Sequence, residues 1–65
     1  MTLEKAQELL RLQVELGSGY NRNSARLILA EVQREHGQEA VDRLIRDLDL
    51  EKAFEFRPGS AFKAP

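Results

Sequence analysis

His36 is the single histidine in a chain of 65 residues, so it is the first side chain to consider for acid–base chemistry near neutral pH. No serine, aspartate or second histidine is placed by the sequence to pair with it. A lone histidine in a chain without cysteine also makes a poor metal site. An enzyme would have to rely on His36 and Tyr20. We therefore expect no catalytic residue, no metal and no cofactor, and a structural or helix-capping role for His36.

The stretch from Gly17 to Asn23 offers a second kind of chemistry, the recognition of a ligand by a loop. Its glycines would let a ligand approach the backbone, and Tyr20 and Arg22 would contact a partner or a phosphate. The same residue types also suit a connection between helices, with a glycine C-cap and an asparagine N-cap. We favour the connection, and keep Tyr20 and Arg22 as candidate partner-binding residues.

Three arginines, Arg22, Arg26 and Arg34, make a modest basic patch on the segment before Gly37. The alternative function that they suggest is a nucleic-acid-associated regulator. However, the segment 38–49, which would be the recognition helix of a helix-turn-helix, carries four acids against two arginines. The formal net charge of −1 adds no long-range attraction to nucleic acid. We expect nucleic acid not to be a partner, and keep Arg26 as a candidate partner-binding residue.

Three helices must position these side chains, because apolar residues recur at helical spacing in three segments separated by glycines. The predicted helices cover 3–16, 24–36 and 38–49, and Asp49 would cap a short turn over 50–54. The fold class is therefore all-α, a small three-helix bundle with a helical domain over 1–54 and a short extended C-terminal tail over 55–65. The predicted core consists of Leu10, Val14, Ile28, Leu29, Val32, Val41, Leu44, Ile45 and Leu48.

The first predicted helix is apolar over more than half of its circumference. One stripe contains Leu3, Ala6, Leu10 and Val14, and a second stripe beside it contains Leu9, Leu12 and Leu16. Such a helix needs two packing partners, and cyclic dimers are the commonest oligomers. We therefore expect a homodimer joined through the second stripe. The competing account is that the tail folds back and covers this stripe within one chain.

The tail region contains three of the four aromatic residues, Phe54, Phe56 and Phe62. Aromatic side chains in a short tail are seldom left in water, given the area that each can bury. We expect Phe54 and Phe56 to fold back onto the core. Phe62 lies beyond the predicted turn at Arg57–Ser60, and the sequence does not decide whether it folds back onto the core or contacts another molecule. It is therefore a candidate partner-binding residue.

The composition, with 10 basic and 11 acidic residues, is that of a globular protein, and the absence of cysteine excludes disulfides. The sequence shows neither a signal peptide nor an apolar run long enough to span a bilayer, so we expect a cytoplasmic protein without membrane contact. These observations together predict a small intracellular protein-interaction or regulatory module. The sequence does not name its protein partner.

Overall fold

The computed structural model describes residues 1–17 and 21–62, and this part of the chain contains helices and no strand. The predicted all-α fold class is confirmed. The helices are α1 over Leu3–Leu16, α2 over Asn21–His36, α3 over Gln38–Asp47 and α4 over Leu50–Phe54. The three long helices of the predicted bundle are thus followed by a short fourth helix, where the sequence predicts a short turn.

The first helix, α1, begins and ends at the predicted residues because local side chains fix both ends. The side-chain oxygen of Thr2 accepts a hydrogen bond of 3.0 Å from the backbone N–H of Lys5. Gly17 adopts a left-handed conformation with φ of 62°, and its N–H donates to two carbonyl oxygens of the last turn.

The second helix, α2, begins at Asn21, three residues before the predicted start at residue 24. Asn21, Asn23 and Ser24 are all residue types that favour an N-cap, so the pattern leaves the start ambiguous. Gly37, with φ of 93°, ends α2 as predicted, and α3 begins directly after it.

Two non-glycine residues in the left-handed conformation enclose α4, Asp49 with φ of 53° and Glu55 with φ of 65°. The prediction that Asp49 caps this turn is wrong, because its side chain makes no capping hydrogen bond. An N-cap side chain reaches the first N–H groups of a helix from an extended backbone, and Asp49 does not have one. The same turn ends α3 at Asp47 instead of residue 49.

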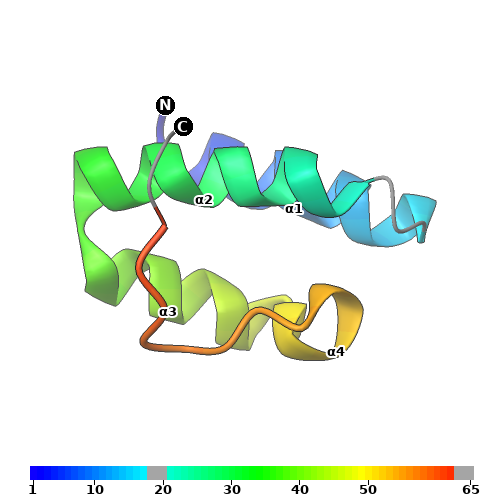
Figure 1. Cartoon of the computed structure of the whole chain (residues 1–65). Coiled ribbons are helices and arrows are strands. Elements are labelled where there is room, and N and C mark those ends of the chain that lie inside the picture. The colour runs from blue at the N-terminus through cyan, green and yellow to red at the C-terminus, as the bar shows by residue number, and fades with distance from the viewer. Residues whose placement is uncertain (18–20, 63–65) are drawn as a thin grey trace.

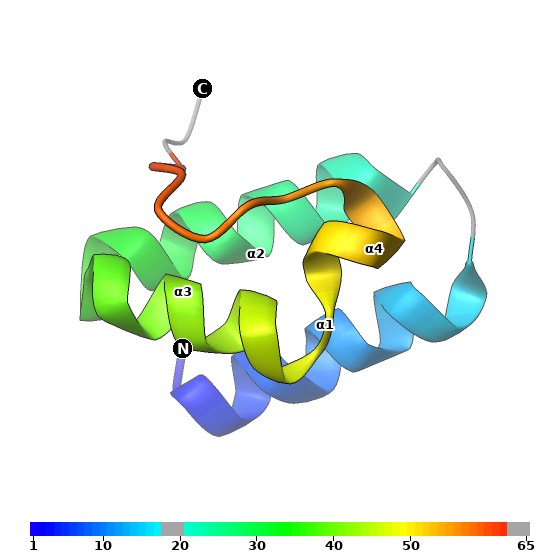
Figure 2. The same ribbon diagram turned by 90° about the horizontal axis from the view of Figure 1, so that it is seen from below.

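The four helices form two layers (Figure 1). α1 and α2 run antiparallel side by side in one layer, and α3 lies against the same side of both of them. α4 continues from α3, and the tail then runs back along the opening between α2 and α3 (Figure 2). In the part of the chain that the structure describes, no helix packs on the face of the α1–α2 layer that points away from α3.

The core lies between the two layers, and six of the nine predicted core residues are buried in it. The other three, Val14, Ile28 and Leu48, are only partly buried. On α2 the inward residues are Ala25, Leu29 and Val32, so Ile28 lies at the edge of the packed face. The buried hydrophobic residues are Ala6, Leu10, Ala25, Leu29, Ala30, Val32, Val41, Leu44, Ile45, Leu50, Phe54, Phe56 and Phe62.

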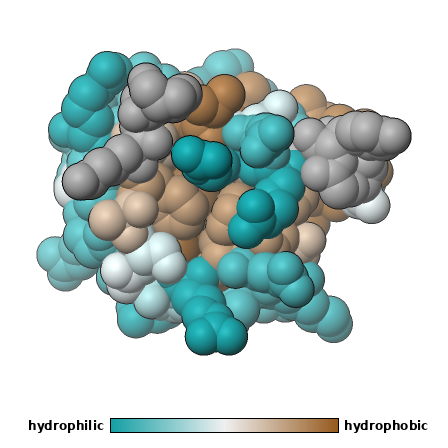
Figure 3. All heavy atoms as spheres, viewed as in Figure 1, coloured by the Kyte–Doolittle hydropathy of each residue, from teal (hydrophilic) through white to brown (hydrophobic). Residues whose placement is uncertain are grey.

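The tail folds back as predicted for Phe54 and Phe56, and Phe62 follows them into the core. The ring centroids of Phe54 and Phe56 are 5.8 Å apart, and those of Phe56 and Phe62 are 5.2 Å apart in an edge-to-face arrangement. Figure 3 shows apolar residues in the middle of this face, with hydrophilic residues around them. The aromatic side chains of the tail therefore complete the core on the side of α2 and α3.

Polar groups of α2 and α3 fix the tail at its turn. Asp42 Oδ1 accepts hydrogen bonds from the backbone N–H of Gly59 at 2.7 Å and from Gln38 Nε2 at 2.9 Å. Gln38 Nε2 also donates to the carbonyl oxygen of Ser60 at 2.8 Å, and the N–H of Phe62 donates to Gln33 Oε1 at 3.3 Å. The hydrogen bond from Gly59 is the main reason why the pKa of Asp42 is lowered from its ordinary value of 3.8.

From the hydrogen bond between Gly59 and the Asp42 carboxylate we predict how the stability of the fold depends on pH. Because the carboxyl of Asp42 has a lower pKa in the folded chain, its stabilising effect is present above pH 3.8 and is lost as the pH falls through the folded pKa. Asp42→Asn keeps the shape and removes the charge. We expect the variant to unfold at a lower temperature than the wild type near neutral pH, and this difference to shrink in acid.

Thermal melts followed by circular dichroism between pH 7 and pH 2 would measure this difference. Glu35, whose pKa is also lowered, is present in both proteins, so the difference between the two melts isolates Asp42. A constant difference across the whole pH range would show that the charge of Asp42 does not hold the turn.

Candidate functional site: the outer face of α1

The strongest candidate surface is the α1 leucine stripe, which we define as Leu9, Leu12 and Leu16. Leu12 is 49% exposed and Leu16 is 60% exposed, and Leu9 is partly buried. The stripe results from the sequence of α1, because Ala6 and Leu10 occupy the face that points into the core. Apolar side chains that lie next to one another on a surface helix are candidates for contact with another protein.

Two further leucines are exposed outside the stripe. Leu27, on α2, is 52% exposed, and Leu3, at the start of α1, is 39% exposed. Leu3 lies on the other flank of the helix, because it lines a hollow together with Ala40 and Leu44 of α3. Leu3 therefore belongs to the junction between α1 and α3, and not to the stripe.

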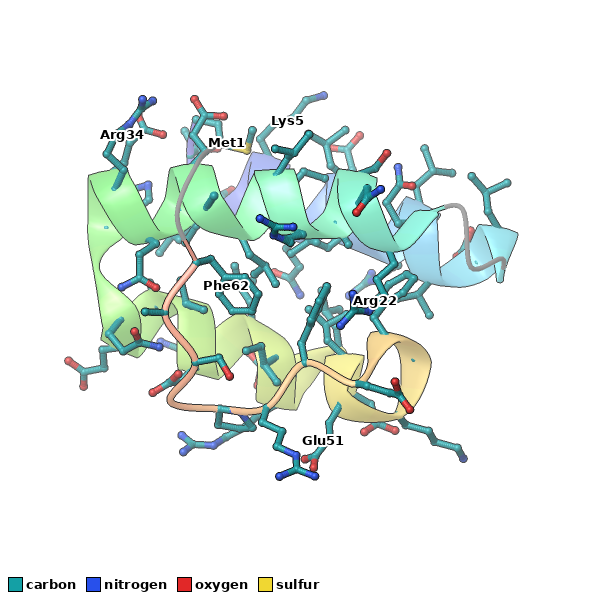
Figure 4. The ribbon with its side chains drawn as sticks, viewed as in Figure 1. Met1, Lys5, Arg22, Arg34, Glu51 and Phe62 are labelled. Carbon is teal, nitrogen blue, oxygen red and sulfur yellow. The ribbon has the colours of Figure 1, made fainter. Side chains whose placement is uncertain are left out.

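Charged side chains accompany the α1 leucine stripe. Lys5 precedes it by one helical turn, and in Figure 4 its side chain points away from α3. Its ammonium lies 3.9 Å from Glu8 Oε1, with both side chains more than half exposed, so this pair contributes little. Glu8, Arg11 and Glu15 are exposed and follow one another at helical spacing beside the stripe.

The described part of the tail, residues 55–62, does not cover the α1 leucine stripe. Its hydrogen bonds go to Gln33 on α2 and to Gln38 and Asp42 on α3, and its rings pack on that side of the molecule. The competing account, in which the tail shields the second stripe of α1, is therefore wrong. The tail has a closer apolar surface to cover, in the opening between α2 and α3.

Two of the predicted partner-binding residues, Arg22 and Phe62, both contact the ring of Phe56. Arg22 Nε donates to the carbonyl oxygen of Phe54 at 2.9 Å, and its guanidinium carbon lies 5.0 Å from the ring centroid of Phe56 (Figure 4). Arg22 thus links α2 to α4 and the tail. Arg26 is exposed on α2. Arg34 also belonged to the predicted basic patch, and it contacts Glu31 at 3.4 Å.

Phe62 is not available to a partner in this fold, and its assignment as a partner-binding residue is corrected. Its side chain is only 8% exposed, because it packs edge-to-face on Phe56. The sequence does not decide whether Phe62 is buried, because its contact with Phe56 depends on the path of the chain after the turn at Arg57–Ser60. Tyr20, the remaining candidate, lies outside the described residues.

His36 makes a contact of the structural kind that the sequence predicts. Its Nε2 donates to the carbonyl oxygen of Met1 at 2.9 Å, beside the ion pair of 2.6 Å between the Met1 amino group and Glu35. The hydrogen bond between these two groups raises the pKa of the amino group and lowers that of Glu35. His36 therefore joins the start of the chain to the end of α2.

Among residues 1–17 and 21–62, no group of three or more His, Cys, Asp or Glu side chains is arranged to hold a metal ion. None of the helices in the same ranges has the length and apolar character needed to cross a membrane. The polar residues that hold the tail, Gln33, Gln38 and Asp42, were not predicted from the sequence. The one local signal was the spacing of four between Gln38 and Asp42, which lets two side chains meet on a helix.

Comparisons of the chain with protein-family models, with curated proteins and with solved structures found no match.

Proposed function

We propose that this chain is a small intracellular protein-interaction module that acts by binding, and that it forms a homodimer through the α1 leucine stripe. The observation that carries the proposal is the exposure of Leu12 and Leu16, at 49% and 60%, on a helix whose opposite face is already packed into the core. Within residues 1–17 and 21–62, neither the tail nor another helix lies over this stripe. A second copy would offer a surface of the same kind.

The free energy gained by burying the exposed leucines limits the affinity of the dimer. Full burial of a leucine side chain contributes roughly 1.5–3 kcal/mol, so the exposed halves of Leu12 and Leu16 offer about 1 kcal/mol each. Two copies therefore gain about 4 kcal/mol from these two positions, and the loss of translational and rotational freedom on association, about 4–15 kcal/mol, offsets this gain. Leu9 and the stems of neighbouring side chains add to this. We expect a weak dimer that depends on protein concentration.

Sedimentation equilibrium tests the proposal over protein concentrations from about 10 µM to 1 mM, the range in which a weak dimer would form. We expect the average mass to rise from that of the 7.4 kDa chain towards twice that value. The double substitution Leu12→Glu with Leu16→Glu should keep the protein at 7.4 kDa throughout and leave its helical circular dichroism intact, because both side chains are exposed.

The matched control is Leu3→Glu, which places the same change on the other flank of the same helix. It should leave the concentration dependence of the mass as in the wild type. A wild-type protein that stays at 7.4 kDa even at about 1 mM would refute self-association through the α1 leucine stripe.

The nucleic-acid alternative gains no support from the arrangement of the arginines. Arg22 is engaged with Phe54 and Phe56, and Arg34 is next to Glu31. We therefore do not propose it as a second function.

A further inference from the structure

A hollow of about 620 Å³ lies where the end of α1 and the start of α2 meet α4, and its volume is in the range of cavities that hold small molecules. Val14 of α1 and Leu48, which follows α3, supply apolar wall to it. Both are predicted core residues, and the structure leaves them only partly buried because they line this hollow. No leucine of the α1 leucine stripe belongs to its lining.

Two basic residues line the hollow, Arg22 of α2 and Lys52 of α4. The hydrogen bond from Arg22 Nε to the carbonyl oxygen of Phe54 and the contact with the ring of Phe56 hold the guanidinium in place, and Figure 4 shows Arg22 pointing from α2 towards α4. Among residues 1–17 and 21–62, no carboxylate forms an ion pair with Arg22 or Lys52. Both positive groups are therefore available to a carboxylate from another molecule.

Two acidic residues, Asp49 and Glu55, line the same hollow from the two ends of α4. Both have the left-handed conformation, which is unfavourable for a residue with a side chain. The helix ends do not account for either carboxylate, because Asp49 makes no capping hydrogen bond and Glu55 ends α4 through its backbone N–H. In the part of the chain that the structure describes, neither carboxylate forms an ion pair, so both are available to an ammonium group.

We infer that this hollow binds an apolar zwitterion, either a free apolar amino acid or a short apolar peptide with free ends. The carboxylate of the ligand contacts Arg22 and Lys52, and its ammonium group contacts Asp49 and Glu55. Its apolar part covers the wall of the hollow. A ligand with a single charge would remove the other two charged groups from water without giving them a partner, which is unfavourable. The site is separate from the α1 leucine stripe, so the inference goes beyond the proposed homodimer.

Nuclear magnetic resonance of the full chain labelled with ¹⁵N tests the site, with leucine and leucyl-leucine as probes. We expect a saturable shift of the amide signals of Val14, Leu48 and Lys52 with at least one probe. Tighter binding of leucine identifies a free amino acid as the ligand, and tighter binding of leucyl-leucine identifies a peptide. Acetylation of the amino group or amidation of the carboxylate removes one charge from the probe, and each should weaken binding by about threefold or more.

Two variants test the charges of the hollow. Asp49→Asn and Lys52→Gln each remove one charge and should raise the dissociation constant of the probe about threefold to tenfold. Asparagine tolerates the left-handed conformation, so Asp49→Asn should keep the helical circular dichroism of the wild type. The matched controls are Asp47→Asn and Lys5→Gln, which make the same changes outside the hollow and should leave the dissociation constant unchanged.

Three results would overturn the inference. They are the absence of a saturable shift with both probes up to about 10 mM, shifts confined to the α1 leucine stripe, and capped probes that bind as tightly as the free ones. A dissociation constant that is unchanged in both Asp49→Asn and Lys52→Gln would also contradict it. Sedimentation measures self-association without a probe, so failure of this site and failure of the homodimer are distinguishable.

Discussion

Replacing Phe56 with alanine should lower the free energy of unfolding by about 3–5 kcal/mol, the usual cost of removing a buried aromatic side chain. Phe56 is only 4% exposed and lies between the rings of Phe54 and Phe62, with the guanidinium of Arg22 5.0 Å from its centroid. The substitution therefore empties the centre of the aromatic cluster. A domain of this length has roughly 3–10 kcal/mol of stability in total, so the variant should be close to unfolded.

Urea unfolding followed by circular dichroism would measure this loss. Arg57→Ala, at the exposed neighbouring position, is the control and should change stability by no more than about 0.5 kcal/mol. Phe56→Leu should recover part of the stability, because it restores most of the apolar volume. A loss below about 1 kcal/mol for Phe56→Ala would mean that the tail contributes little to the core.

The second large effect is expected on α2, where Leu29→Ala should cost about 2–5 kcal/mol. Leu29 is fully buried between the two helical layers, and the substitution would leave a cavity there. Leu27→Ala is the matched control, since Leu27 lies on the same helix but is 52% exposed, and should cost no more than about 0.5 kcal/mol. Ile28→Ala should fall between the two, because Ile28 is only partly buried.

The stability losses of these three variants, at the consecutive positions 27, 28 and 29, show which face of α2 points into the core. Their stabilities are best measured at low micromolar concentration, where a weak dimer adds little to the free energy of unfolding. Equal losses for Leu27→Ala and Leu29→Ala would mean that α2 presents another face to the core than the structure shows.

The sequence by itself determines the helical character of the chain and the bounds of α1. The reason is that these features depend on neighbouring residues. Thr2 caps the start of α1 and Gly17 caps its end, each through hydrogen bonds to groups within one turn. Gly37 separates α2 from α3 by its backbone conformation. The periodic spacing of Leu10, Leu29 and Leu44 likewise identifies residues that the structure buries.

The rotation of α2 about its own axis could not be predicted from the spacing of its apolar residues. Ile28 and Leu29 are adjacent and equally apolar, and the helical spacing includes both. The structure buries Leu29 fully and Ile28 in part, and Ala25 is the other fully buried residue on that turn of the inward face. Which side of an apolar stripe is innermost depends on the neighbouring helices, and the spacing within one helix does not contain that information.

The path of the tail was decided by the tertiary structure. The hydrogen bond from Gly59 to Asp42 and that from Phe62 to Gln33 join residues 17 and 29 positions apart, and no local pattern specifies such pairs. The sequence predicts that the aromatic side chains must be buried, but not that they close the opening between α2 and α3. Because the aromatic side chains close that opening, Leu12 and Leu16 on the outer face of α1 remain exposed. The sequence identifies these leucines as apolar residues outside the core stripe. It does not show that residues 55–62 of the tail pack elsewhere.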